Sequence, residues 1–321
     1  RQVPRQEDHR LVQRAGDHHH RSPARERSWG PDYLQAGIAA FEDYEGPDFN
    51  VALAYSRTAI NRRSGEWRTG VQAGRDPGAF TEWHQPVDRA LRAFVHVRLS
   101  AWDRAVGAFD ATGHKTAELE VRHAGVELSA GRELGTWGEL RAGVVRESGE
   151  ISTEVGDAGA PDAGFDTGDA FLQFHVDRLD DVDFPRAGGG LRARFTAGLR
   201  SLGSDVRYEQ ASLEGSLART WGSLTARVGG LLGSTLDGDA PTQSLFALGG
   251  FSRLSGLQQD ERTGQHAVLL GAAVYRRLAL VPLAPLHAGL SAEYGEVFAT
   301  REGIRLRYGI ASGGVFLGLD T

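Results

Sequence analysis

The chain has 321 residues, of which 40% are hydrophobic and 24% charged, and its formal net charge is −6. This mild negative charge argues against a nucleic-acid partner, because no concentrated basic face follows the first 30 residues. No run of about 18 apolar residues occurs, which excludes a transmembrane helix, and the absence of cysteine excludes disulfides, thiolate metal sites and a cysteine nucleophile.

Residues 1–28 differ from the rest of the chain. They are rich in Arg, Gln, Asp and His and show no clear period. We therefore expect a disordered or non-native segment. The run His18–His20 is not predicted to bind a metal, since binding would have to order a flexible tail. No cofactor or metal site is expected elsewhere.

From residue 29 onward, apolar residues alternate with polar or small ones. In the stretch 191–200, for example, every odd position is apolar and every even one is Arg, Thr or Gly. Side chains of a strand point alternately to its two faces, so this pattern predicts strands with one apolar and one polar face. About fourteen are expected, at 33–42, 48–60, 65–74, 78–85, 91–103, 115–130, 137–153, 168–179, 189–200, 206–219, 224–234, 265–278, 286–298 and 304–319.

The length of these strands and the charges on their second face indicate the fold class. Many segments are 9 to 14 residues long, with Arg and Glu on the polar side. This combination predicts an all-β fold, an antiparallel transmembrane β-barrel with lipid outside and water inside. The charged residues expected to face the lumen are Arg98, Glu118, Glu120, Arg122, Arg141, Arg192, Arg194 and Arg227. The simplest role for them is to keep the interior solvated.

Two further expectations concern the strands themselves. In the sixth segment the apolar set changes phase, from Ala117, Leu119 and Val121 to alternate positions from 124 onward, which predicts a β-bulge near His123. Residues 103–111 are read as an extension of the fifth strand. Aromatic residues near strand ends predict the girdles at the membrane surfaces; they are Trp29, Tyr33, Trp67, Trp83, Trp102, Trp137, Trp221 and Tyr275.

The connections provide an independent test of this topology. One alternate set is short throughout, at 61–64, 86–90, 131–136, 180–188, 220–223 and 279–285. The other set contains the two long connections, 154–167 and 235–264. Short periplasmic turns alternating with longer external loops are typical of outer-membrane barrels. The Asp-rich stretch 155–168 is interpreted as a solvated external loop, because it lacks the ligand spacing of an EF-hand.

One long connection resembles a known family. The stretch Ser244–Leu257, read SLFALGGFSRLSGL, and the strand that follows resemble the sixth loop of the Omp85 (BamA/D15 surface antigen) superfamily. The resemblance implies that this loop folds back into the barrel. The family tip usually reads Val/Ile-Arg-Gly-Phe/Tyr, and here it would be Leu254–Leu257; the arginine is missing, with Ser255 in its place, and Arg253 is a possible substitute. The motif residues are Leu248, Gly249, Gly250, Arg253, Leu254, Ser255, Gly256 and Leu257.

Several motifs narrow the resemblance to the C-terminal barrel of bacterial patatin-like phospholipases. They include the start 28–34, the stretch 65–68, the acidic segment 176–185 and the Leu-Ser-Gly tip. In that family a lipase domain and a POTRA module precede a sixteen-stranded barrel. The resemblance therefore implies that residues 29–321 form an Omp85-type barrel that is truncated at the C-terminus.

These observations lead to an expected function. We expect an integral protein of the bacterial outer membrane that anchors, and helps to export, an N-terminal passenger. Its partners would be outer-membrane lipid, a passenger or POTRA module missing from this chain, and the outer-membrane assembly machinery. The chain itself is not expected to be an enzyme, since it has no Gly-x-Ser-x-Gly nucleophile.

Other functions remain open at this point. A passive diffusion porin would show the same alternation but would not need the Leu-Gly-Gly and Leu-Ser-Gly motifs. A barrel-assembly or two-partner-secretion transporter of the Omp85 type would share the loop. A soluble β-protein such as a carbohydrate-binding sandwich would have shorter strands, usually of about 5–6 residues.

Overall fold

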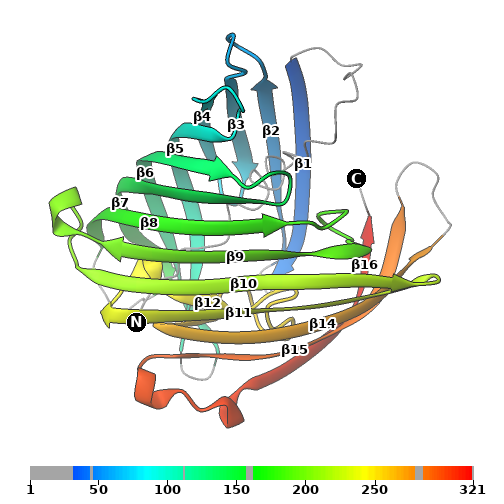
Figure 1. Ribbon diagram of the computed structural model, residues 1–321. Helices are drawn as coiled ribbons and strands as arrows, with labels where there is room; N and C mark the ends of the chain where they lie inside the picture. Colours follow the sequence, from blue (N-terminus) through cyan, green and yellow to red (C-terminus); the bar gives the residue numbers. More distant parts are fainter. Residues whose placement is uncertain (1–31, 44–45, 111–112, 157–161, 279–284, 320–321) are drawn as a thin grey trace. The chain divides into compact units, whose positions relative to one another are not determined.

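The computed structural model describes residues 32–43, 46–110, 113–156, 162–278 and 285–319 (Figure 1). Within these residues the fold is all-β. A 14-stranded antiparallel sheet follows chain order from β1 to β16, and β12 and β13 form a separate two-stranded sheet. The predicted N-terminal segment 1–28 and Trp29 lie outside the described residues.

The strands of the large sheet are long, and several exceed 14 residues. Their bounds are β1 Asp32–Asp43, β2 Gly46–Arg57, β3 Glu66–Gly74, β4 Gly78–Pro86, β5 Ala93–Phe109, β6 Lys115–Glu133, β7 Gly138–Gly156, β8 Ala163–Asp177, β9 Ala187–Gly198, β10 Tyr208–Trp221, β11 Leu224–Gly238, β14 His266–Leu278, β15 Leu286–Phe298 and β16 Ile310–Leu319. The small sheet consists of β12 Phe246–Leu248 and β13 Arg262–Gly264.

Each of the fourteen predicted strands corresponds to one strand of the large sheet, so the predicted antiparallel all-β fold is confirmed. The extension of the fifth strand is confirmed as well, because β5 continues to Phe109. The start of the last strand is corrected: β16 begins at Ile310, not at 304. Residues 301–303 and 306–308 form short 3-10 turns, and the hydroxyl of Tyr294 donates a hydrogen bond to the carbonyl of Leu306.

The two faces of each strand differ in exposure, as the alternation predicts. On β5, Val95 and Leu99 are exposed on one side, whereas Phe94 and His96 are buried on the other. We call the side with the exposed apolar residues the apolar face and the other the polar face. Apolar residues exposed on one face are what lipid contact requires.

The predicted bulge near His123 is absent, since β5 and β6 pair without interruption from the pair Arg98–Glu127 to the pair Ala105–Glu120. The register shifts instead between Ala108 and Phe109, and between Glu118 and Leu119 where β6 pairs with β7. The change of phase has another cause. Leu128 is exposed on the apolar face, whereas Leu119 and Val121 are buried on the opposite face. The apolar residues change sides while the pairing of β6 with β5 continues without a register shift.

Glycines within the strands make room for aromatic rings on neighbouring strands. A Cβ atom on Gly78 would lie 2.0 Å from the ring of Trp102, and one on Gly70 would lie 2.4 Å from the ring of Phe80. Trp102 and Phe80 are buried and pack with Ala52. Trp102 and Tyr275 are each only 4% exposed, so their predicted place in an exposed girdle is wrong. Trp67, Trp83, Trp137 and Trp221 are exposed.

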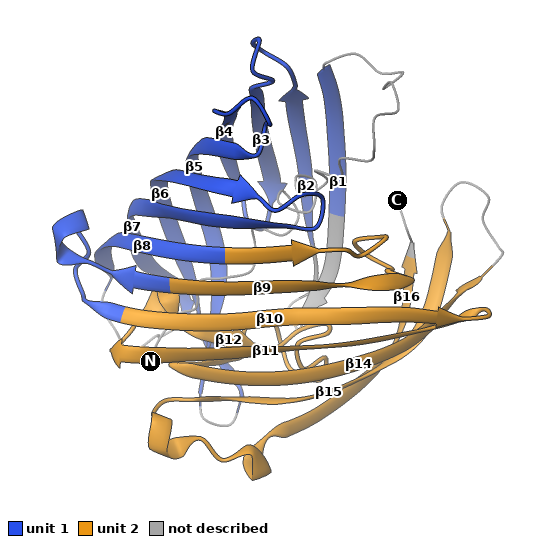
Figure 2. Cartoon of the chain, viewed as in Figure 1, with its two compact units in different colours: residues 1, 6–173, 196–208 blue, residues 2–5, 174–195, 209–321 orange. Residues whose placement is uncertain are grey.

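The chain divides into two compact units, shown in Figure 2. Among the described residues, the first contains 32–173 and 196–208, and the second contains 174–195 and 209–319. Each is described by itself below. No helix in the described ranges is long and apolar enough to cross a membrane.

Candidate functional site

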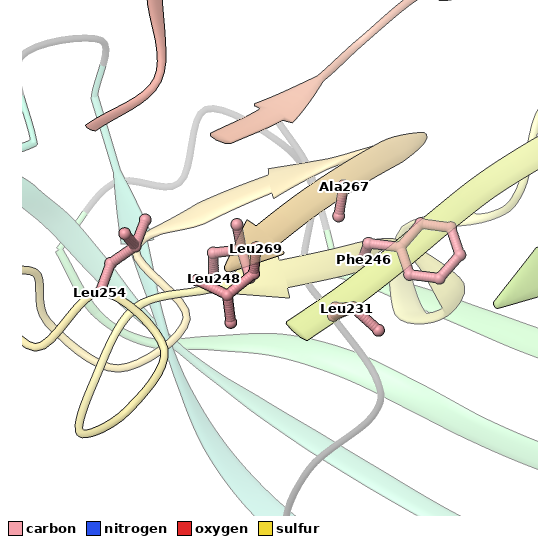
Figure 3. Packing of buried hydrophobic residues seen from close by; sticks show 6 residues of the cluster. All are labelled: Leu231, Phe246, Leu248, Leu254, Ala267 and Leu269. Carbon is pink, nitrogen blue, oxygen red and sulfur yellow. The ribbon is translucent and has the colours of Figure 1, made fainter. Parts of the chain in front are cut away.

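The most elaborate local structure in the second unit is the connection between β11 and β14, residues 239–265. It folds back as the hairpin of β12 and β13, which pairs Phe246 with Gly264 and Leu248 with Arg262. This hairpin packs on the strands that flank it. Figure 3 shows the buried hydrophobic cluster that holds it, formed by Leu231, Phe246, Leu248, Leu254, Ala267 and Leu269.

The tip of this connection, residues 249–258, is held in a tight conformation by its own backbone. The N–H of Gly249 donates to the carbonyl of Arg253 at 2.8 Å, and that of Gly250 donates to Leu257 at 3.1 Å. Gly249 has a φ of 137°, and a Cβ there would lie 2.0 Å from the carbonyl oxygen of Gln258. Only glycine fits such a position.

Leu254 is the first residue of the Leu-Ser-Gly tip and directly precedes Ser255, which stands where the resembling family carries arginine. It has a φ of 85°, which is unusual for a residue with a side chain, and it is completely buried. Burial of its side chain in the cluster offsets the backbone strain, which is of order 1–3 kcal/mol. The predicted motif is thus anchored by the buried hydrophobic side chain of Leu254.

The tip is attached to the strand wall through its main chain. The N–H of Ser255 donates to Glu293 Oε2 on β15 at 3.0 Å, and the N–H of Gly256 donates to Ser312 Oγ on β16 at 2.6 Å. Glu293 is only 5% exposed. A buried carboxylate needs hydrogen-bond donors, and the tip backbone supplies one.

Arg253 provides the ionic contact of the tip. Its Nη2 lies 3.3 Å from Glu214 Oε1 on β10. Burial lowers the pKa of Arg253 to about 10, although the carboxylate of Asp260 opposes this shift, so the guanidinium stays charged at neutral pH. The arginine therefore sits two positions before the expected one, Ser255, and pairs with Glu214 on β10.

The base of the connection is fixed by a polar network around Gln265. Its Oε1 accepts hydrogen bonds from Thr235 Oγ1 at 2.6 Å and from the N–H of Ala240 at 3.1 Å, and its Nε2 donates to the carbonyl of Ala240 at 3.0 Å. From the connection between β15 and β16, Arg301 donates to the carbonyl of Leu236 at 2.9 Å. Both ends of the folded segment are thus anchored.

The first unit carries a ladder of charges on its polar face. Glu82 on β4 lies 3.3 Å from Arg68 on β3 and 3.0 Å from Arg98 on β5. His96 lies 3.7 Å from both Glu82 and Glu127, and Arg141 on β7 continues the series at 3.8 Å from Glu127. Opposite charges therefore alternate across five neighbouring strands.

The structure separates the eight predicted lumen residues into three groups. Arg98 and Arg141 belong to the charge ladder. In the second unit, Arg192 and Arg194 alternate with the exposed Leu191 and Phe195 and so lie opposite the apolar face. Arg227 alternates with the exposed Val228 in the same way, and its Nη2 lies 3.5 Å from Ser216 Oγ.

Glu118, Glu120 and Arg122 are placed on the other side from the one predicted. With no bulge at His123, they share a face with the exposed Leu128. Arg122 pairs there with Asp103 at 3.1 Å and also contacts Glu120. The prediction failed because it assumed that one face stays apolar along the whole strand.

Sequence reasoning missed the strand residues that receive the tip, Glu293, Ser312 and Glu214. Each is a single polar residue on the polar side of its strand, and the chain offers dozens of such positions. No group of metal-ligating residues occurs among the residues that the structure describes.

No family model matches the sequence, and no curated protein matches it. The fold does match solved structures. BamA from Haemophilus ducreyi lacking POTRA domains 1–3 aligns with a TM-score of 0.68 at 10% identity, over 90% of this chain and 64% of that one. CdiB from Acinetobacter baumannii aligns with a TM-score of 0.60 at 9% identity, over 89% of this chain and 53% of that one.

CdiB from Escherichia coli aligns with a TM-score of 0.61 at 13% identity, over 91% of this chain and 56% of that one. The chain thus spans between about half and two thirds of the length of these structures. Because identity is so low, the likeness concerns the fold alone: the 14-stranded antiparallel sheet is similar to the folds of BamA and CdiB.

Proposed function

We propose that this chain is an Omp85-type β-barrel of the bacterial outer membrane, which anchors an N-terminal passenger and helps to export it. The single observation that carries the proposal is the connection between β11 and β14, folded back with its tip bound to Glu293 and Ser312. A simple pore has no need of a long connection whose backbone is hydrogen-bonded to two strands.

The two faces of the sheet support the membrane location. Side chains such as Leu34, Ile38, Leu270 and Leu290 are 60–75% exposed in strands, which is unfavourable in water. Lipid would cover them. On β6 the apolar residues of the exposed face from Ala124 to Ala130 form a stretch of about 20 Å along the strand, which would make up part of a lipid-facing band.

The charge ladder supports a water-filled interior. Each of its two carboxylates, Glu82 and Glu127, lies beside an arginine, so the polar face carries charged groups without a strong net charge. Such a wall would let a polypeptide pass without binding it strongly. The role that we assign to these residues is physical, since the chain contains no Gly-x-Ser-x-Gly pentad, and any phospholipase activity would belong to a separate N-terminal domain.

The kind of passenger is the finer part of the proposal. The Leu-Ser-Gly tip and the acidic segment 176–185 favour the patatin-like phospholipase type. The alternative is a barrel-assembly or two-partner-secretion transporter, and the match to BamA and CdiB favours it. In either case the proposed partners are outer-membrane lipid, a passenger or POTRA module, and the assembly machinery.

The test is refolding of residues 28–321 with and without detergent, followed by gel mobility before and after heating. We expect β-rich, heat-modifiable protein in detergent or lipid alone. A soluble, β-rich monomer without detergent would overturn the membrane location. Fusing a patatin-like domain or a two-partner-secretion substrate to the barrel, and assaying each at the cell surface, then separates the two passenger types.

A further inference from the structure

The turn between β8 and β9, residues 178–186, has a rigid internal structure of its own. Asp181 Oδ1 accepts hydrogen bonds from the N–H groups of Asp183 and Phe184 at 2.9 and 2.8 Å. Asp180 Oδ1 accepts from the N–H groups of Arg186 and Ala187 at 2.8 and 2.9 Å. Two aspartates thus hold Phe184 and Pro185 in one fixed presentation.

Phe184 inserts among residues of three distant strands. Its ring stacks on His287 of β15, with centroids 4.2 Å apart and planes 8° apart, and meets Tyr275 of β14 edge-on at 5.8 Å. A Cβ on Gly318 of β16 would lie 2.1 Å from the Phe184 ring. The hydroxyl of Tyr275 donates a hydrogen bond to the carbonyl of Pro185. The side chain of Pro185 is fully buried.

These contacts cross the sheet. In the strand order, β10 and β11 stand between β9 and β14, so the turn cannot reach Tyr275 through strand pairing. It lies across the same face that carries the folded connection, since Tyr275 and His287 point to the side of Glu293. A turn that served only to join two strands would have no reason to bury an aromatic ring against β14 and β15, three and four positions from β9 in the sheet order.

The same aromatic cluster also receives the tip of the connection. Tyr275 lies 6.2 Å from Phe316 of β16, and Phe316 meets Phe251 of the tip edge-on at 5.5 Å and 75°. Phe251 is 65% exposed, so the Phe316 contact is a substantial part of what holds its ring. The turn and the tip therefore approach one shared seat, Tyr275 and Phe316, from two sides.

We propose that the turn between β8 and β9 is a latch, closed by Phe184 in its aromatic seat, and that its closure is coupled to the docked state of the tip through Tyr275 and Phe316. Withdrawal of Phe251 frees Phe316, loosens Tyr275 and lets Phe184 leave. By reciprocity, withdrawal of Phe184 weakens the docking of the tip. The inference rests on the proposed function, in which both elements lie inside the barrel.

The latch can be tested by proteolysis of the full chain refolded in detergent. Arg178 and Arg186 flank the turn, and both are exposed. Trypsin needs a flexible segment, so the rate of cleavage after Arg186, followed by mass spectrometry, reports how often the latch opens. The variants are Phe184→Ala, Tyr275→Phe and Phe251→Ala, with Phe49→Ala as control because Phe49 is also exposed but lies in the other unit.

We expect Phe184→Ala to raise the cleavage rate about tenfold, since two ring contacts are lost. Tyr275→Phe removes only the hydroxyl and raises it less, which keeps the test valid if Phe184→Ala fails to fold. Phe251→Ala, although remote from the turn, raises it several-fold, and Phe49→Ala leaves it unchanged. The coupling is overturned if Phe251→Ala matches Phe49→Ala, and the latch is overturned if Phe184→Ala and Tyr275→Phe also leave the rate at the wild-type value.

These outcomes are distinct from failure of the proposed function. Heat-modifiable mobility of the wild-type protein tests the barrel, whereas the relative cleavage rates test the latch in whatever folded state forms. A heat-modifiable barrel with equal cleavage rates in all variants would overturn the latch and leave the barrel proposal intact. A soluble wild-type protein whose variants still differ in cleavage rate would overturn the barrel proposal and support the latch.

Discussion

Glu293 on β15 accepts a hydrogen bond from the backbone N–H of Ser255 at 3.0 Å, so the strand wall holds the tip of the β11–β14 connection by its main chain. The contact does not depend on the side chain of Ser255. It does depend on the carboxylate, because Glu293 is buried and its charge must be satisfied.

This relationship predicts a graded response at Glu293. Glu293→Ala should lower the free energy of unfolding by roughly 1.5–3 kcal/mol, the value of a hydrogen bond to a charged group, and Glu293→Gln should lower it less because an acceptor remains. The measurement is urea unfolding in detergent. The exposed Glu302 provides the control, Glu302→Ala. Equal midpoints for Glu293→Ala and Glu302→Ala would mean that the contact contributes nothing.

The backbone conformation of Gly249 leads to a second prediction about the tip. Gly249→Ala would place a Cβ 2.0 Å from the carbonyl oxygen of Gln258, in a backbone conformation with a φ of 137°. We expect undocking of the tip, seen as faster tryptic cleavage after Arg253. Gly271→Ala on β14 is the matched control, since its nearest neighbour is Glu293 Cγ at 3.8 Å. If both variants are cleaved like the wild type, the tip tolerates a different backbone path.

The register of β6 predicts where the apolar band ends. The chain has no cysteine, so a single introduced one reacts without background. Arg122→Cys should react quickly with a water-soluble maleimide in lipid vesicles, and Leu128→Cys should not, because lipid covers that position. The two residues share one face, so a difference between them reports depth. Fast labelling at both positions would remove Leu128 from the lipid-covered band.

Strand positions could be predicted well from the sequence because exposure on one face forces a period of two over long segments. The same logic failed where its assumption failed. Around Ile304–Tyr308 apolar residues and arginines alternate as in a strand, yet the chain turns there and the ring of Tyr294 occupies the space beside Gly309. Apolar and polar alternation shows that the two faces of a segment lie in different environments. It does not show that the segment pairs with a neighbouring strand.

The sequence predicted the tip of the candidate site but not the strand residues that bind it. The motif around Gly249 and Leu254 stands out because consecutive glycines and small residues are rare in a strand pattern. Its partners Glu293 and Ser312 lie 38 and 56 residues away from the residues they bind. A single polar residue on the polar side of a strand carries no local signal of what it contacts. Such pairs follow from the folded path of the connection.

Asp88, in the turn between β4 and β5, gives a prediction about pH. Burial pushes its pKa upward, but the backbone N–H groups of Ala93 and Arg92, which donate to Oδ1 at 3.0 and 2.7 Å, hold it below its ordinary value. A lowered folded pKa means that the stabilisation is present above the unfolded pKa of about 3.9 and is lost as pH falls through the folded one.

Hydrogen exchange at the amides of Arg92 and Ala93 measures this loss. Protection should be constant above about pH 5 and fall at lower pH, after correction for the intrinsic exchange rate. In Asp88→Ala, protection should be low at every pH. A wild-type profile that stays flat through the acid range, or that matches Asp88→Ala throughout, would exclude the carboxylate as the group that orders this turn.

The charge ladder makes the strongest prediction about stability. Glu82 faces Arg68 and Arg98 within 3.3 Å, and the exposed fraction of all three side chains is below 18%. Glu82→Gln leaves two arginines with no carboxylate between them, so it should cost roughly 3–5 kcal/mol. The double variant Glu82→Gln/Arg98→Gln should recover part of this lost stability, because one of the two arginine charges is gone.

The control is Glu150→Gln. The side chain of Glu150 is 62% exposed, so this change should alter stability by about 0.5 kcal/mol or less. Urea unfolding followed by tryptophan fluorescence measures all three. If Glu82→Gln matches Glu150→Gln, water hydrates the arginines well enough to replace the carboxylate, and the polar face is wetter than its burial indicates.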